Sequence, residues 1–355
     1  LPGDGIGPEI MSEAIKVLLT IAECFGHEFV LQKALIGGAA WEKHGSHFPE
    51  ETKKICEGSD AILFGSIGGP IQVQGNPKWK DCERNSILQL RQYFRFQTNL
   101  RPCRIYPALA DSCVLRPHII ENGVDILCVR ELSRDIYFGD HRIEMIDGVK
   151  SAFDVMEYDE KTIADIAHAA FQAARHRRRK VTSVDKANVL ACSRLWREVV
   201  TEISKDYPEC HLEHLLVDNC AMQLICCPKA FDVLLMPNMF GDILSDEASV
   251  LAGSLGMLPS ASLNKQGFGL YEPSSGSAPD IAGKGIANPI GQILSTAMML
   301  AYSFHLVQES QAIEQAVEKS LDQGFRTRDI STPNDKLGPI STQEMGNMII
   351  KNLIS

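Results

Sequence analysis

The sequence predicts an α/β protein in which a buried, largely parallel sheet is flanked by helices. Short apolar runs alternate along the chain with longer segments in which apolar residues recur at helical spacing. Runs that are apolar on both faces and separated by helices are typical of buried parallel strands. The chain has 355 residues, 45% of them hydrophobic, which is enough for one large or two medium domains with well-buried cores.

Five apolar runs are expected to form strands of this sheet. They are "DAILFG" (60–65), "VDILCV" (124–129), "KVTSVD" (180–185), "HLLVD" (214–218) and "FDVLLMPN" (231–238). Helices are predicted over 8–25, 161–174, 189–204 and 287–304. The last of these is apolar nearly all round, which indicates a central helix or one at a subunit contact.

Composition excludes several classes of protein. The formal net charge of −10 argues against nucleic acid as a partner, because phosphate binding needs a basic face. The 11 cysteines contain no C-x-x-C motif, so we expect reduced thiols and a cytoplasmic protein. No apolar run reaches membrane-spanning length, and no charged-then-apolar leader is present, so no membrane partner is expected.

Polar residues follow several of the predicted strands. Arg130, Lys186 and Asp218 each stand at a strand end, and Asn238 with Asp242 follows another. Ligands of open α/β sheets bind at the carboxyl ends of the strands. For any one of these residues, the exit of a strand from the core is the better explanation, whereas all of them together favour an active site.

The stretch "NMFGDILSDEAS" (238–249) places Asp242 and Asp246 four residues apart, on one face of a predicted helix. Two like charges at this spacing gain nothing for the fold. With Asp218 they offer oxygen ligands only, which suits Mg²⁺ or Mn²⁺ rather than zinc. The alternative is a helix cap for Asp242 and a solvated acid for Asp246, but the apolar surroundings favour a metal site.

Three arginines are candidates for gripping a dicarboxylate. Arg91, Arg101 and Arg130 lie in "LQLRQYFRFQTNLRP" and "CVREL", and guanidinium groups bind both oxygens of a carboxylate. Spacing alone is weak support, and Arg95 and Arg104 are as readily surface charges.

Lys186 and Tyr137 are candidates for proton transfer. A lysine near a divalent cation can act as a base, and a tyrosine can deliver a proton to a developing enolate. An ordinary salt bridge for Lys186 and a packed ring for Tyr137 remain the alternatives.

Two glycine-rich stretches are candidates for nucleotide contact. "PGDGIGPE" (2–9) lacks the G-x-G-x-x-G spacing, which argues against a Rossmann domain. "EPSSGSAPDIAGKGIANP" (272–289) allows close backbone approach to a flat ligand such as adenine. Asp280 in this stretch could accept both ribose hydroxyls and would repel a 2′-phosphate.

Taken together, these strings resemble the β-decarboxylating dehydrogenases, the family of isocitrate, isopropylmalate and tartrate dehydrogenases. The matching pieces include "LPGDGIGPEI", "TNLRP", "VREL…IYFG", "VTSVDKANVL", "VDNCAMQL", "MPNMFGDILSDEAS" and "GLYEPSSGSAPDIAGKGIANP", in one order over nearly the whole chain. The resemblance implies the two-domain isocitrate/isopropylmalate dehydrogenase-like fold, an α/β fold with a large mixed sheet flanked by helices. It implies a first domain of residues 1–99 and 253–355, a second of residues 100–252, and an arm at about 138–157 that packs on a dimer partner.

The activity that the resemblance implies is NAD-dependent oxidative decarboxylation of (2R,3S)-3-isopropylmalate to 4-methyl-2-oxopentanoate and CO₂ in leucine biosynthesis. Three alternatives remain: a sister enzyme acting on tartrate, D-malate or isocitrate, a non-catalytic regulatory subunit, and a metal-dependent lyase or aldolase without nicotinamide.

By the same resemblance, each candidate residue has a role. Arg91, Arg101 and Arg130 bind the substrate carboxylates, and Asp218, Asp242 and Asp246 hold Mg²⁺ or Mn²⁺, with Asp218 also at the substrate. Lys186 is the base, and Tyr137 is the proton donor. In such enzymes the lysine and the first aspartate come from the second subunit, so a homodimer with shared active sites is implied.

Specificity residues follow from the same comparison. Ile87 and Leu88, with Val189, would form an apolar wall for an isopropyl group, unless the first two are core residues. The expected NAD contacts are Glu272, Gly276, Ser277, Ala278, Pro279, Asp280, Ile281 and Asn288. Ser275 departs from the histidine of many relatives, and Glu83 is offset from the usual position of a glutamate near the nicotinamide.

Overall fold

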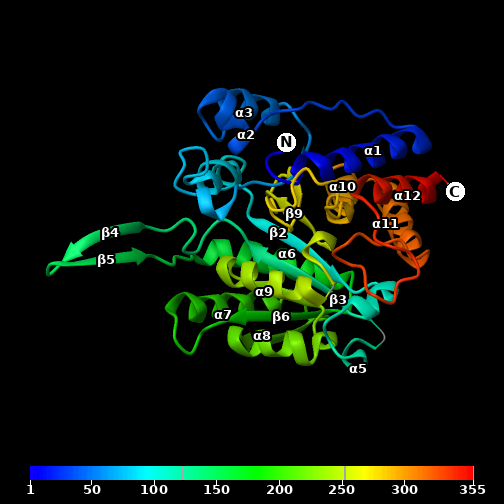
Figure 1. The fold of residues 1–355 in the computed structure, drawn as a ribbon. Helices are drawn as coiled ribbons and strands as arrows, with labels where there is room; N and C mark the ends of the chain where they lie inside the picture. Colours follow the sequence, from blue (N-terminus) through cyan, green and yellow to red (C-terminus); the bar gives the residue numbers. More distant parts are fainter. Residues whose placement is uncertain (122, 252, 355) are drawn as a thin grey trace. The chain divides into compact units, whose positions relative to one another are not determined.

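The computed structural model describes residues 1–121, 123–251 and 253–354. Figure 1 shows the chain with colours that follow the sequence. The chain divides into two compact units. The first unit comprises Leu1–Arg95, Ile105–Pro117 and Ser249–Ser355, and the second comprises Phe96–Arg104 and His118–Ala248. Residues 105–117 therefore group with the first unit, whereas the sequence-based division put them in the second domain.

The second unit is built on a mixed sheet with the strand order β2-β3-β8-β6-β7. The strands are β2 (Thr98–Arg104), β3 (Asp125–Glu131), β8 (Val233–Met236), β6 (Lys180–Asp185) and β7 (His211–Leu216). β2 is antiparallel to β3, and the remaining neighbours are parallel. The predicted strand at 214–218 needs a correction, because β7 ends at Leu216 and Asp218 lies in the first turn of the next helix.

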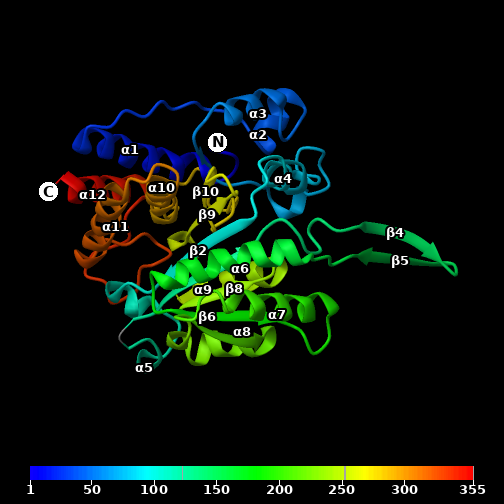
Figure 2. The same ribbon diagram turned by 180° about the vertical axis from the view of Figure 1, so that it is seen from behind.

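Helices cover both faces of this sheet. They are α6 (Glu160–Arg175), α7 (Ala191–Ser204), α8 (Val217–Cys226) and α9 (Asn238–Leu251), and the short helix α5 (Pro117–Ile120) precedes β3. Figures 1 and 2 show α6 and α7 side by side on one face and α8 and α9 on the other. Trp196 of α7 is fully buried, donates from Nε1 to Ser183 Oγ at 3.1 Å, and packs edge-on against Tyr158.

A separate antiparallel hairpin projects from the second unit (Figures 1 and 2). It consists of β4 (His141–Ile146) and β5 (Val149–Asp154), which lie within the predicted arm at 138–157. Asp147 and Gly148 connect the strands with φ of 51° and 80°, the backbone that a two-residue hairpin turn requires. The packing of this hairpin on a partner subunit stays a prediction.

The first unit has a small sheet in which β10 (Gly269–Pro273) is parallel to β1 (Ile62–Leu63) and antiparallel to β9 (Pro259–Leu263). Its helices are α1 (Gly7–Phe25), α2 (Gly38–His44), α3 (Glu50–Glu57), α4 (Gln89–Tyr93), α10 (Ile290–Tyr302), α11 (Val307–Asp322) and α12 (Thr342–Ile354). α10 packs against β9 and β10 and also contacts α1 and α11. The helix that is apolar nearly all round is therefore the central helix of this unit.

All 11 cysteines of the chain are free thiols. Within the described ranges, no helix is both long enough and apolar enough to cross a membrane.

Replacing Trp196 by Ala should destabilise the second unit by about 3–5 kcal/mol, because a large cavity would remain between α7 and the sheet. Urea unfolding followed by circular dichroism would measure the change. Val30→Ala, at a side chain that is 82% exposed, is the control and should cost less than about 0.5 kcal/mol. Equal losses for the two variants would contradict this packing.

Candidate active site

Asp242 and Asp246, two of the predicted metal ligands, lie in α9. β8 is buried along its whole length and ends just before Pro237, after which α9 begins at the buried Asn238. Asp242 is partly exposed and Asp246 is exposed. The four-residue spacing puts both carboxylates on one face of the helix, as predicted.

Arg130 of β3 and Arg101 of β2 reach this face from the sheet. Arg130 is 1% exposed, donates to Asn238 Oδ1 from Nε at 2.9 Å, and forms an ion pair with Asp242. Arg101 Nη1 donates to Asp246 Oδ1 at 3.1 Å, and its Nη2 lies 3.5 Å from Asp242 Oδ1. The structure therefore brings together two of the three candidate arginines and two of the three candidate aspartates.

Tyr137 joins the same cluster. Its hydroxyl donates to Asp242 Oδ2 at 2.7 Å, and the guanidinium of Arg130 lies 5.5 Å from the centre of its ring. Desolvation raises the pKa of the Asp246 carboxyl, with Arg101 opposing the rise and Asp242 adding to it. The cluster thus holds two carboxylates, two guanidinium groups and one phenol, with both guanidinium groups and the phenol paired with the Asp242 carboxylate.

Sequence reasoning missed the residues that hold Tyr137 in place. Asp135, buried and with φ of 79°, accepts from Met239 N at 3.1 Å and from the Tyr158 hydroxyl at 3.1 Å. Tyr158 also accepts from Asn238 N at 2.8 Å. These bonds tie the loop after β3 to the start of α9. The only sequence signal was an acid two residues before the tyrosine, and that pattern is common in loops.

Lys186 and Asp218 form a second group. Lys186 follows β6 and its Nζ forms an ion pair with the Asp218 carboxylate of α8. The hydrogen bond from Lys186 lowers the pKa of Asp218. Among the described residues, no three His, Cys, Asp or Glu side chains lie close enough to hold a metal together. The expectation that Asp218 completes a site on another subunit stays a prediction.

The predicted specificity residues lie in both units. Ile87 is buried, and Leu88 partly buried, in a π-helical turn at Arg84–Leu88 that leads into α4. Val189 of the second unit is 64% exposed. Arg91, in α4 of the first unit, donates from Nη2 to Glu272 Oε1 at 3.0 Å. A glutamate that was expected at the cofactor therefore pairs with an arginine that was expected at the substrate.

The glycine-rich segment after β10 is anchored by the first turns of the chain. Ile6 N donates to the Ser277 carbonyl at 2.9 Å, and a Cβ on Gly5 would lie only 2.0 Å from that oxygen. Gly283 N and Gly285 N donate to the Glu9 carboxylate at 3.3 and 3.0 Å. The sequence "PGDGIGPE" thus supports the second glycine-rich stretch through close backbone contact.

The predicted cofactor residues differ in accessibility. Gly276, Pro279 and Asp280 are exposed, and Ser277, Ala278 and Ile281 are partly exposed. Ser275 Oγ is buried and has no hydrogen-bond partner within the described parts of the chain. Asn288 is buried, and its amide donates to Asp329 Oδ2 at 3.0 Å and accepts from Ile290 N at 3.0 Å. Its contact with the adenine stays a prediction.

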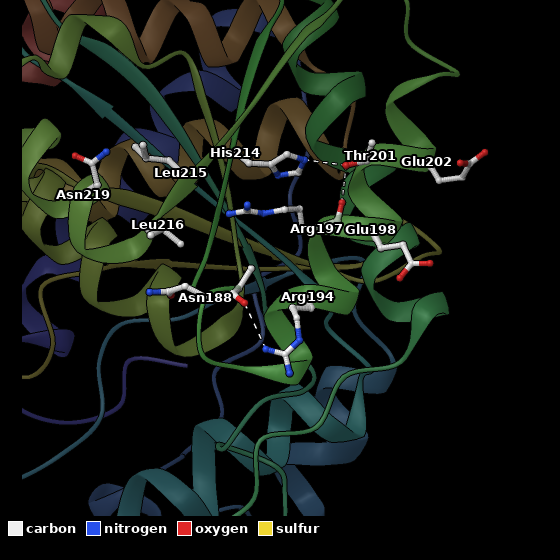
Figure 3. A pocket seen from close by; sticks show the side chains of 11 residues that line it. Asn188, Arg194, Arg197, Glu198, Thr201, Glu202, His214, Leu215, Leu216 and Asn219 are labelled. Atoms are coloured by element: carbon white, nitrogen blue, oxygen red, sulfur yellow. Dashed lines mark hydrogen bonds between the residues drawn. The ribbon is translucent and has the colours of Figure 1, made fainter.

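A surface pocket of about 870 Å³ opens in the second unit between α7, the end of β7 and the start of α8 (Figure 3). Arg194, Arg197 and His214 lie along its wall. Thr201 Oγ1 donates to the Arg197 carbonyl at 2.6 Å, so it accepts from His214 Nε2 at 2.9 Å. Burial, and then the charge of Arg197, lowers the pKa of His214, while Asp185 opposes them.

Comparison with known proteins identifies the family. The isocitrate/isopropylmalate dehydrogenase family matches residues 1–349. The chain belongs to this family. It is 55% identical over 350 residues to a 3-isopropylmalate dehydrogenase of Haemophilus influenzae, covering 98% of this chain and 97% of the relative. It is 52% identical over 354 residues to one of Desulfotalea psychrophila, covering 99% and 98%.

Solved structures agree with the family assignment. Isocitrate dehydrogenase from Methylococcus capsulatus superposes with a TM-score of 0.88 at 33% identity, covering 100% of this chain and 98% of the other. The TT0538 protein from Thermus thermophilus superposes with a TM-score of 0.86 at 30% identity, covering 100% and 67%. The predicted α/β fold with a mixed sheet is confirmed, and the chain is an oxidoreductase of this family.

The depressed pKa of His214 makes stability depend on pH. Between the ordinary histidine pKa of about 6.5 and the lower folded value, the unfolded chain binds more protons, so stability falls as pH falls through this window. His214→Gln should remove this part of the slope while keeping a polar side chain against Thr201. Urea midpoints at several pH values between about 5 and 7.5 would show it, and an unchanged slope would contradict the assignment.

Proposed function

We propose that the protein catalyses NAD-dependent oxidative decarboxylation of (2R,3S)-3-isopropylmalate to 4-methyl-2-oxopentanoate and CO₂, a step of leucine biosynthesis. The observation that carries the proposal is the cluster of Arg101, Arg130, Tyr137, Asp242 and Asp246 in the second unit. The names of relatives at 51–55% identity support the choice of substrate within the family.

Arg101 and Arg130 would bind the substrate carboxylates. Both guanidinium groups are buried and already held in place, that of Arg101 by Asn99 of β2 at 2.8 Å and that of Arg130 by Asn238 of α9. A held guanidinium loses little side-chain entropy when it binds a carboxylate through two parallel hydrogen bonds. The assignment of Arg91 to the substrate stays a prediction from the resemblance.

The donor set fits a hard divalent cation. Asp218, Asp242 and Asp246 offer carboxylate oxygens, the ligands that Mg²⁺ and Mn²⁺ prefer, and no nitrogen or sulfur donor accompanies them in the predicted set. When bound, the cation would supply positive charge beside the substrate oxygen, and NAD⁺ would supply the hydride acceptor.

Lys186 and Tyr137 would move the protons. Lys186, held beside Asp218, would take the proton of the substrate hydroxyl as hydride leaves C2. The β-keto acid so formed loses CO₂, and Tyr137, whose hydroxyl is held by Asp242, would donate a proton to the carbon left behind. The Arg130 guanidinium near the Tyr137 ring would favour the phenolate that follows proton donation.

The segment around 272–289 would bind the nucleotide. Asp280 is exposed on it and carries a negative charge, which suits the two ribose hydroxyls of NAD and opposes the 2′-phosphate of NADP. Ser275 Oγ offers a hydrogen-bonding group that the described chain leaves without a partner. These features support NAD as the cofactor.

We further propose a homodimer in the cytoplasm in which Lys186 and Asp218 serve the active site of the partner. α8 and α9 of the second unit expose Met222, Ile225 and Ile243, which are 57%, 49% and 60% exposed. Exposed apolar side chains on two helices that cover the same face of a sheet are typical of an interface. The free state of all the cysteines is consistent with a reducing compartment.

The wild-type protein should produce NADH and CO₂ from 3-isopropylmalate with Mn²⁺, faster than from D-malate or isocitrate. Asp242→Asn keeps the shape of the side chain but removes its charge, so kcat/KM should fall at least about 100-fold, or roughly 2.7 kcal/mol. Faster turnover of D-malate or isocitrate by the wild type would refute the substrate, and an unaffected variant would refute the role of Asp242.

Shared sites predict complementation between inactive variants. Lys186→Met and Tyr137→Phe should each be inactive as homodimers, but a mixed dimer would hold one complete site. After unfolding and refolding of an equal mixture, half of the dimers are mixed, so about a quarter of wild-type activity should return. No return of activity from refolded dimers would show that each chain supplies its own lysine.

Dimer formation through α8 can be tested separately. Ile225→Glu should shift the protein toward monomers in sedimentation, because a buried, unpaired charge would be placed in the interface. Ile354→Glu, on the exposed end of α12, is the matched control and should leave the oligomeric state unchanged. Equal behaviour of both variants would place the interface elsewhere.

A further inference from the structure

We infer that Arg197 and Asp185 are positioning residues that hold the loop carrying Lys186. The inference rests on the proposed function, in which Lys186 takes the hydroxyl proton. Neither Arg197 nor Asp185 is among the residues predicted to contact substrate, metal or nucleotide.

Asp185 lies at the end of β6, immediately before Lys186, and its side chain is fully buried. Its carboxylate accepts from Arg197 Nε at 2.8 Å and Arg197 Nη2 at 2.8 Å, one bond to each oxygen. The same carboxylate accepts from Ala187 N at 2.8 Å. Asp185 therefore links the guanidinium on α7 to the peptide on the far side of Lys186.

The backbone of Lys186 is held by α7 as well. Lys186 N donates to Ser193 Oγ at 3.0 Å, and the Lys186 carbonyl accepts from Val189 N at 3.0 Å and Leu190 N at 2.9 Å. Ser193 and Arg197 are four residues apart, so they lie on one face of α7. One face of this helix thus fixes the backbone on both sides of the lysine.

Because the Asp185 carboxylate is buried, it depends on the positive charge of Arg197. A carboxylate as buried as that of Asp185 needs its cation, because an unpaired buried charge is strongly disfavoured. Without Arg197, Asp185 must take up a proton or turn toward water, and either change loosens the bond to Ala187 N. A displacement of about 1 Å at a reacting group costs on the order of 100-fold in rate. The ion pair of Arg197 and Asp185, which we call the clamp, therefore helps to place the Lys186 amine.

The pocket in Figure 3 makes this clamp accessible to a chemical test. Arg197 crosses the wall of the pocket, and its side chain is 39% exposed while that of Asp185 is not exposed at all. Truncation of Arg197 to alanine would leave the guanidinium position open to solvent from the pocket side. Free guanidinium or methylguanidine could then occupy it and pair with Asp185.

The experiment compares Arg197→Ala, Arg197→Lys and the control Arg175→Ala in the full protein with Mn²⁺, NAD and 3-isopropylmalate. Arg175, the last residue of α6, is 56% exposed and forms an ion pair with Glu209, so its loss removes the same charge away from Asp185. We expect kcat of Arg197→Ala to fall about 10- to 100-fold, with KM within about threefold of wild type. Arg197→Lys should retain more activity because an ammonium group can still neutralise Asp185.

Methylguanidine at non-denaturing concentration should raise kcat of Arg197→Ala several-fold and leave wild type and Arg175→Ala unchanged. The deuterium isotope effect at C2 should be larger in Arg197→Ala than in wild type, because the chemical step is slowed. A full kcat in Arg197→Ala would overturn the inference. A low kcat with no rescue and an equal loss in Arg197→Lys would also overturn it, by indicating a merely structural role.

Failure of the inference differs from failure of the proposed function. If wild-type protein forms no NADH from 3-isopropylmalate, the proposed function falls and the clamp loses its reaction. If wild type is active and Arg197→Ala behaves as Arg175→Ala does, the clamp alone is refuted.

Discussion

The buried guanidinium of Arg130 is the constraint on which the second unit depends. A permanent positive charge that is 1% exposed must be satisfied within the protein, and it lies on β3, which has a neighbouring strand on each side. Its partners come from Asn238 and Asp242 of α9 and from the ring of Tyr137. The charge therefore sets where the helix begins relative to the sheet and where the tyrosine loop lies.

Close packing around this charge explains a glycine in the helix. A Cβ on Gly241 would lie 2.7 Å from Arg130 Cγ and 2.9 Å from its Cβ. The Arg130 side chain could not lie between β3 and α9 if residue 241 were larger than glycine. A glycine that weakens the helix locally is thus required for the approach of α9 to the arginine.

The sequence predicts which segments form strands better than it predicts which strands pair and where each one ends. The apolar runs at 124–129, 180–185 and 231–238 correspond to buried strands because a strand buried on both faces needs a continuous apolar sequence. The run at 60–65 yields a strand of only two residues, since its extent depends on pairing with β10, more than 200 residues away in the chain. The sequence places Asp218 at the end of a strand, whereas it lies in a helix, because the end of a strand depends on how far its neighbour pairs with it.

For the candidate site, too, the sequence predicts which residues take part better than which residues pair. Residue type and spacing indicated Asp242 with Asp246, and the arginines as carboxylate binders. Which carboxylate each arginine meets depends on the register of β2 and β3, which pairs Asn99 with Arg130 and Arg101 with Cys128. Glu272 pairs with Arg91 through a contact between distant segments of the chain. Asp185 pairs with Arg197 across a turn whose geometry the sequence does not specify.

The hairpin of β4 and β5 has a consequence for how the protein behaves on dilution. An isolated two-stranded ribbon is marginally stable in water, and this one exposes Ile143, Met145 and Val149 at about two-thirds of their surface. Its order therefore depends on what covers it. If a second copy does so, local folding of the ribbon becomes a function of protein concentration, and proteases would cleave it first in dilute samples.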